Sequence, residues 1–493
     1  MTLLALLALL AAAGAAEPEA PPSAPDPLVS AVASLAKGSW QQAATAATQV
    51  LDDAGRADAH ASAWRTLGDA LDAGGLPYAA LTAWLQGVAL APAAVSPSYA
   101  KAISRVDDLS EDVWAGGLLG SDLGVPVDGQ TRGTLALLKA RAAFDEGSWG
   151  TVLNLLALVP ADHPRVLEAD VLRGVSLAQQ ERYADALGPL ASSYEKARAL
   201  GRDEHYVNTL ALNTARTFYA SGNYGQAMAF YARVDREDPW WTEALLERAW
   251  AHFRVDDPAG TIALLQTHRA PMYGSWYLPE ADLLRAQALY LMCKFPETTR
   301  TIDAFAARYT PLRDELAATL GSLDAAGAFD DGRAYLAGGS TKLPATILRR
   351  LRSDDRFRDA LAAVDAGRAE LPRLSGAWGE RARTALQARL DARVATEGGR
   401  VLELARQAKA QLDDMLQGLE LTRIDLLTLE SQLLGQAAAR GEDVDMGGEE
   451  RVRELRRKGK RVWPFEGEFW LDELGQYVVL ARPDCPDTLR RGE

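Results

Sequence analysis

The sequence has few of the residues that build metal centres and disulfide-rich scaffolds. Its 493 residues include two cysteines and five histidines, and no histidine has a second His or Cys at the spacing of metal ligands. G-x-S-x-G elbows, Walker A loops and dinucleotide-binding G-x-G-x-x-G motifs are also missing. We therefore expect no metal, no cofactor and no catalytic residues, and we predict that the protein is not an enzyme.

Positive charge is in deficit. Lys and Arg number 53 against 67 Asp and Glu, so the formal net charge is −14. An acidic chain is poorly suited to binding the phosphate backbone, and we expect no nucleic-acid partner. The length corresponds to roughly three domains of ~150 residues, or to one extended array.

Long apolar runs are limited to the beginning of the chain. Residues 3–13 read LLALLALLAAA, which is the length of a signal-peptide core and too short to span a bilayer. The small residues that follow predict cleavage near Ala16, so we assign 1–16 as a signal peptide and the Pro-rich stretch 17–27 as a spacer. No later stretch predicts a transmembrane anchor. We expect a periplasmic or secreted protein.

The part of the chain that follows repeats every thirty-odd residues. One unit comprises Trp64, Leu67, Gly68, Leu71, Gly75, Ala80, Trp84 and Pro92. Its large residues lie one helical turn apart, Gly68 and Ala80 allow the helices to approach, Gly75 serves the turn, and Pro92 ends the second helix. The same spacing returns at Ala211, Ala215, Phe218, Gly222, Tyr224, Ala227, Tyr231 and Pro239. One helical pair cannot bury its apolar face alone, so such units must stack.

These segments resemble tetratricopeptide repeats (TPR). The resemblance covers residues 28–312, about seven repeats, with an insertion at 94–132. It implies an all-α, TPR-like right-handed α-solenoid whose concave groove is lined by the first helix of each pair and binds peptides or proteins. The groove residues implied by the family pattern are Trp64, Arg65, Asp69, Arg173, Asn213, Arg216, Arg248 and His252.

The period changes in the second half. Residues 313–344 contain several glycines and are interpreted as a joint. Within 345–440, apolar residues then fall at alternating steps of three and four, with one polar gap at Thr422, at Val401, Ala405, Ala408, Leu412, Met415, Leu419, Leu426, Leu429 and Leu433. This pattern predicts a long antiparallel helical hairpin within one chain. The alternative is a two-chain coiled coil that makes the protein a homodimer.

The last segment, 441–493, combines a basic run with an aromatic cluster. Seven Lys or Arg lie between Arg451 and Arg461, either as a solvated helix face or as a patch for an acidic partner. The aromatic residues either cap the last repeats or bind a partner; they are Trp463, Phe465, Phe469, Trp470 and Tyr477. Cys293 and Cys485 either form a disulfide, as export would favour, or remain two free thiols.

Together these observations predict a non-enzymatic periplasmic scaffold or adaptor that binds protein or peptide partners, such as envelope proteins, through the TPR superhelix. The alternative is a structural component of a multiprotein cell-envelope machine, for example a gliding-motility-type assembly, that assembles through the helical hairpin.

Overall fold

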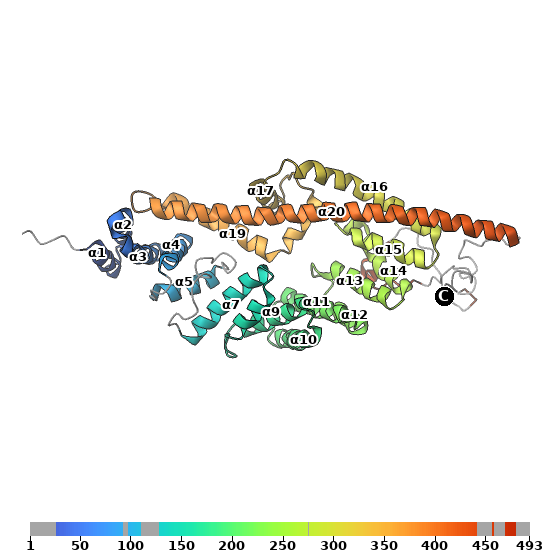
Figure 1. The fold of residues 1–493 in the computed structure, drawn as a ribbon, viewed down its shortest axis with the longest axis horizontal. Coiled ribbons are helices and arrows are strands. Elements are labelled where there is room, and N and C mark those ends of the chain that lie inside the picture. Colours follow the sequence, from blue (N-terminus) through green and yellow to red (C-terminus); the bar gives the residue numbers. More distant parts are fainter. Residues whose placement is uncertain are drawn as a thin grey trace, which may run out of the picture. The chain divides into compact units, whose positions relative to one another are not determined.

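The computed structural model describes residues 26–91, 97–109, 128–274, 276–440, 456–457 and 469–479, and every regular element in these ranges is a helix. The chain forms two compact units, which are described separately. Unit 1 comprises residues 1–105, 120–122 and 367–387, and unit 2 comprises 106–119, 123–366 and 388–493. Figure 1 shows the helices in chain order.

Unit 1 is built from helix pairs. Its main helices are α1 (Pro27–Ala36), α2 (Trp40–Asp52), α3 (His60–Ala73) and α4 (Pro77–Leu90), joined by the start of α5 (Pro97–Asp108). From α1 to α4 each helix packs on the next, and α1 also packs on α3. Gly68 allows the close approach of α3 and α4, because a Cβ there would overlap the buried Trp84 ring.

Unit 2 continues the same architecture over a longer stretch (Figure 1). Its helices are α7 (Gly129–Asp145), α8 (Trp149–Leu156), α9 (Val166–Gln179), α10 (Tyr183–Ala199), α11 (Glu204–Ala220), α12 (Tyr224–Tyr231), α13 (Trp241–Arg254), α14 (Pro258–Gln266), α15 (Pro279–Leu291) and α16 (Phe295–Leu320). Consecutive helices pack on one another, and the first helices α7, α9, α11, α13 and α15 also pack in series. Stacking of this kind buries apolar faces that one pair would leave exposed.

The same turn closes seven helix pairs of the described chain. One residue in each turn has a left-handed backbone, at Gly38, Gly75, Gly147, Glu181, Gly222, Asp256 and Cys293. The next residue donates its backbone N–H to the carbonyl five positions earlier, as Leu76 does to Leu71 and Asn223 does to Phe218, both at about 3 Å. This is the hydrogen bond of a Schellman motif, which satisfies carbonyls at the helix end. Together with the serial packing of the first helices, this recurrence describes a repeated, TPR-like helix pair.

The segment predicted to be a glycine-containing joint is largely helical. Helix α16 continues through Pro311 to Leu320, and α17 spans Ala325–Leu336. Asp324 caps α17 by accepting a hydrogen bond from the Gly327 backbone at 2.8 Å. The glycines at 321 and 338 lie at the C-terminal ends of α16 and α17.

The predicted hairpin has two very unequal arms. Helix α18 (Ala345–Leu348) and the 3₁₀ turn η5 (Arg349–Arg352) precede α19 (Asp355–Glu370), a second 3₁₀ turn η6 (Leu371–Arg373) and α20 (Glu380–Arg440). Within unit 2, Arg356 at the start of α19 donates to Glu397 of α20 at 2.9 Å, so the short helix runs antiparallel to the beginning of α20. Beyond this contact, α20 packs against other helices.

The remainder of α20 lies along the end of the repeat array. The Tyr277 hydroxyl is 2.9 Å from the Ala408 carbonyl and 2.9 Å from Gln411 Oε1, and Arg313 of α16 is 3.3 Å from Asp413. Leu412 and Leu419 are buried, in keeping with the predicted apolar stripe. Over this part of its length, α20 therefore contacts the loop before α15 and helix α16 of the same chain.

The segment 469–479 packs on the last repeats. Leu474 is buried in the apolar cluster that contains Trp241 and Leu245, and the Gly475 backbone N–H donates to Thr267 Oγ1 at 2.7 Å. Phe469 and Tyr477 also pack against this cluster. A non-local segment thus completes the core around α13 and α14.

No helix in the described ranges is long and apolar enough to cross a membrane. The predicted signal peptide, most of the spacer, and the insertion apart from residues 97–109 and 128–132 lie outside the described residues.

Candidate functional site

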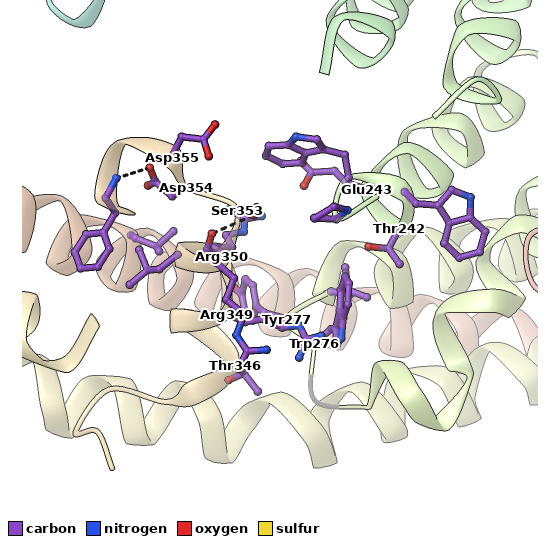
Figure 2. A pocket seen from close by; sticks show the side chains of 18 of the residues that line it. Thr242, Glu243, Trp276, Tyr277, Thr346, Arg349, Arg350, Ser353, Asp354 and Asp355 are labelled. Atoms are coloured by element: carbon purple, nitrogen blue, oxygen red, sulfur yellow. Dashed lines mark hydrogen bonds between the residues drawn. The ribbon is translucent and has the colours of Figure 1, made fainter. Parts of the chain in front are cut away.

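A cavity of about 940 Å³ lies in unit 2, between the beginning of α13, the loop before α15, the turn η5 and one face of α20. Figure 2 shows Arg349, Arg350 and Asp354 on one side and Thr242 and Glu243 on the other. Its volume is near the upper end of the range for ligand pockets, about 300–1,000 Å³.

The loop before α13 is held by a buried carboxylate. Asp238 accepts hydrogen bonds from the Trp240 backbone at 2.8 Å, from Asn208 at 3.1 Å and from His205 Nδ1 at 2.9 Å. Its side chain is 4% exposed. These three hydrogen bonds hold the loop in place, so Arg236 and Trp240 line the cavity in defined positions.

The loop before α15 supplies aromatic side chains. Arg308 of α16 donates to the carbonyls of Gly274 at 3.1 Å and Trp276 at 2.7 Å, which fixes the course of this loop. Tyr273 and Trp276 meet edge to face with ring centroids 5.2 Å apart. Burial raises the pKa of Tyr277, so its hydroxyl stays protonated and donates to α20.

The turn η5 supplies three arginines, Arg349, Arg350 and Arg352. The residues between and before them, Leu348 and Leu351, are buried and anchor the turn. The preceding loop is fixed by Asp331 of α17, which accepts hydrogen bonds from the backbones of Lys342 at 3.0 Å and Leu343 at 2.7 Å. The arginines therefore project from a packed turn.

A fully buried carboxylate lies in the α20 wall. Glu397 is 0% exposed and accepts from Arg356 at 2.9 Å and from Arg400 at 2.6 Å. A buried carboxylate is tolerated when charged donors surround it in this way. Removal of either arginine would leave that charge incompletely paired.

The sequence-predicted groove residues are divided between the two units. Trp64, Arg65 and Asp69 lie on α3 in unit 1, and the other five lie on α9, α11 and α13 in unit 2. Only Arg216 of the eight is among the residues lining the cavity. The family pattern places them all on first helices, as expected, but a position on a first helix does not determine which side chains are free.

Several of these polar side chains link neighbouring helix pairs. Asp69 of α3 is 3.2 Å from Lys101 of α5, and Arg216 of α11 contacts Glu247 of α13 at 2.5 Å. Trp250 of α13 continues the pattern by donating to Glu280 of α15 at 2.8 Å. These contacts span about one repeat in the sequence, so part of the predicted groove chemistry stabilises the stack.

Arg216 lies in a half-buried charge cluster. Burial would lower its pKa, but hydrogen bonds to Glu247 and the charges of Glu247 and Glu243 raise that pKa above the usual range. Burial raises the pKa of Glu247, partly offset by Arg216. The pair is a charge-assisted contact between repeats.

Four other predicted groove residues have local partners or partial burial. Arg173 donates to Asp170 at 2.6 Å and to the Leu156 carbonyl at 3.2 Å, while His252 Nδ1 is 2.8 Å from Asp257. Arg248 is half-buried, and burial lowers its pKa. Asn213 is half-buried on α11. Their role in a binding groove stays a prediction.

The remaining predicted sites are partly outside the described residues. Trp463, Phe465 and Cys485 lie there. Cys293 occupies a left-handed turn position with φ 55° and is not a free thiol. Its pairing with Cys485 stays a prediction. Trp470 is 61% exposed, unlike Phe469 and Tyr477, which pack on the repeats. Among the described residues, no His, Cys, Asp and Glu cluster could hold a metal ion.

The arginines of the η5 turn, which line the cavity, were not predicted from the sequence. Leu348–Arg352 reads LRRLR, in which buried leucines alternate with arginines. That local signal was available, but the aromatic partners Trp240 and Trp276 are more than seventy residues away and only the tertiary structure brings them near.

The fold defines a TPR-like, all-α helical-repeat protein, on the evidence of the stacked pairs and their shared turn. No protein-family model matches the chain, and no curated protein matches it. Among solved structures, the chain is similar to one from the APC/C hetero-tetramer Cut9–Hcn1, with 12% identity, a TM-score of 0.19, and coverage of 88% of this chain and 93% of that one. Because this TM-score is low, the fold is described from the helix packing within this chain and not from the similarity.

Proposed function

We propose that the protein is a non-enzymatic scaffold that binds protein or peptide partners through the repeats of unit 2, and that it acts in the periplasm or outside the cell after loss of residues 1–16. One observation carries the proposal: the first helices α9, α11, α13 and α15 pack in series. Serial packing presents a continuous surface made from equivalent positions, and such surfaces are suited to extended partners.

The proposed binding surface includes Arg173, Asn213, Arg248 and His252. Asn213 is a useful position for a test because no hydrogen bond of its side chain is found within the described part of the chain. An amide can both donate and accept, so it suits recognition of a partner backbone. Substitution by arginine would add bulk and charge to that surface without removing a structural contact.

A second candidate function is assembly of a multiprotein envelope complex through α20. It is favoured by three apolar side chains on the C-terminal third of this helix, because Leu421, Ile424 and Leu427 are 58%, 52% and 57% exposed. Buried Leu419 and Leu426 occupy the opposite side of the helix, so this part of α20 is apolar on two faces. A homodimer or a larger assembly would cover the exposed face.

The test is capture of partners by the full mature chain from envelope extract, followed by titration calorimetry with the purified partner. Asn213→Arg is expected to weaken binding at least about tenfold, or about 1.4 kcal/mol. The matched control Gln179→Arg, at the exposed end of α9, should bind like the wild type. Equal binding by all three proteins would contradict a first-helix surface, and the absence of any direct binder would contradict the scaffold.

A further inference from the structure

The cavity in unit 2 carries positive charge that the chain itself does not neutralise. Six arginines and seven carboxylates line it, which by count alone gives no positive excess. The ion pairs are unevenly distributed, however. Arg216 and Arg400 bind carboxylates of this chain. Within the described ranges, no carboxylate forms an ion pair with the other four: Arg236, Arg349, Arg350 and Arg352.

Six of the seven lining carboxylates, by contrast, have a partner, and within the described ranges Glu237 alone forms no ion pair, against four such arginines. Their cationic or imidazole partners are Arg216 for Glu243, His205 for Asp238, Arg400 and Arg356 for Glu397, Arg358 for Asp355, Arg406 for Glu403 and Arg400 for Asp354. Several of these partners come from outside the cavity lining. The unpaired charge that remains is therefore positive.

Aromatic rings position the arginines in place of carboxylates. The guanidinium of Arg349 lies 4.1 Å from the Trp276 ring centroid, Arg236 lies 5.6 Å from Trp241, and Arg352 lies 5.0 Å from Tyr335. A guanidinium on a ring face keeps its edge N–H donors available for another ligand. Burial lowers the pKa of Arg349, which remains a cation.

The geometry points to an acidic segment of a protein partner as the occupant: we propose that its Asp or Glu carboxylates bind Arg349, Arg350 and Arg352, while an apolar side chain packs against Trp240 and Trp276. Arginine forks match carboxylates in bidentate geometry, and fixed aromatic and arginine side chains are typical of interface hot spots. This inference rests on the proposed scaffold function for the class of partner. It adds the chemistry of the partner and a binding site distinct from Asn213.

The site differs from a surface patch in its rigidity. Leu348 and Leu351 fix the η5 turn, Asp331 fixes the loop before it, and Arg308 fixes the loop that carries Trp276. Little ordering is therefore required when a partner binds, which favours affinity.

The experiment measures fluorescence anisotropy of a short labelled peptide of Asp, Glu, Leu and Phe, added to the full mature chain. In a matched control peptide, Asn replaces each Asp and Gln replaces each Glu. The acidic peptide is expected to bind the wild type, and its binding should weaken as the salt concentration rises from ~50 to ~500 mM. It should bind the variant Arg349→Gln/Arg350→Gln/Arg352→Gln at least about tenfold more weakly than the wild type.

The control removes the same charge elsewhere. Arg182→Gln/Arg198→Gln/Arg300→Gln changes three arginines that are 51%, 57% and 73% exposed, and it should bind the acidic peptide within about twofold of the wild type. If the η5 triple variant fails to fold by circular dichroism, Arg350→Gln/Arg352→Gln serves instead, since both residues are exposed.

Equal loss in both triple variants, equal binding of the amide peptide, or no binding to the wild type would overturn the inference. Tighter binding of a single-stranded oligonucleotide than of the peptide would also overturn it. These failures are distinguishable from failure of the scaffold, because the captured partner would still bind the wild type and respond to Asn213→Arg.

Discussion

Glu370 caps helix α4 from a distant part of the chain: its Oε2 accepts a hydrogen bond from the backbone N–H of Ala79, 291 residues earlier, at 2.9 Å. Its Oε1 accepts from the Tyr78 N–H at 3.0 Å. Both donors belong to the first turn of α4, where backbone N–H groups have no partner within the helix. The chain thus returns in unit 1 to complete the second helix pair.

Replacing this cap should destabilise the protein. Glu370 is 5% exposed, and burial raises its pKa although the two backbone donors act in the opposite sense. Glu370→Ala leaves two N–H groups without an acceptor, so we expect a loss of about 1–3 kcal/mol in the free energy of unfolding. Urea denaturation measures it. Glu420→Ala, at an exposed position of α20, should change stability little.

Neighbouring glycines in α20 should respond in opposite directions to the same substitution. A Cβ on Gly398 would overlap the backbone of Ala325 at the start of α17, whereas a Cβ on Gly399 meets nothing within 4 Å. We expect Gly398→Ala to lower the free energy of unfolding by about 1–3 kcal/mol through overpacking. Gly399→Ala should raise it by about 0.5–1 kcal/mol through helix propensity. Thermal melts of both variants check this prediction, and similar effects would refute the close contact.

A glutamate occupies one of the left-handed turn positions and should be improved by glycine. Glu181 has φ 60°, in a region that costs a non-glycine residue about 1–2 kcal/mol. Glu181→Gly should therefore raise the melting temperature, while Glu195→Gly, in the interior of α10, should lower it. A lower melting temperature for both would show that the α9–α10 turn does not have the assigned geometry.

The pH dependence of stability should contain a component from His268. This side chain is buried, its Nε2 is 2.8 Å from the Thr242 carbonyl, and burial lowers its pKa to about 4. In the unfolded chain His268 takes up a proton near pH 6.5, whereas in the folded chain it does so only near pH 4. The free energy of unfolding should therefore fall as the pH is lowered between these two values, by up to about 1.4 kcal/mol per pH unit.

The variant His268→Gln removes that component. Its free energy of unfolding, measured in urea at about pH 7 and about pH 5, should approach the wild-type value as the pH falls. A constant difference between the two proteins across this interval would mean that His268 titrates normally in the folded state.

Much of the repeat architecture could be predicted from the sequence because its determinants are local. Gly68, Ala80 and Trp84 recur at helix crossings with a fixed spacing, and Gly75 and Gly222 mark turns that the structure places in the left-handed region. Each of these features depends on residues within one pair.

The second half was less predictable because its contacts are distant. The heptad stripe at Leu412 and Leu419 indicated a long helix correctly, but not that its partners would include Tyr277 and Arg313 rather than a matching arm. Glycines at 321 and 338 end helices, and the sequence alone does not distinguish a helix end from a joint.

The candidate site was largely missed for the same reason. Arg349 and Trp276 are separated by more than seventy residues, and only the tertiary structure brings the guanidinium within 4.1 Å of the ring centroid. Arg216 was found by its position on a first helix, yet it is also committed to Glu247 of the next pair. Position within a repeat predicts the helix face, whereas ion pairs between repeats decide which charges remain available.

Hydrogen–deuterium exchange of the mature chain with its captured partner tests the central claim most directly, since it reports where binding protects the backbone. The account predicts slower exchange in α9, α11 and α13 and in residues 346–353 when the partner binds. Protection limited to the second helices α10, α12 and α14 would contradict it.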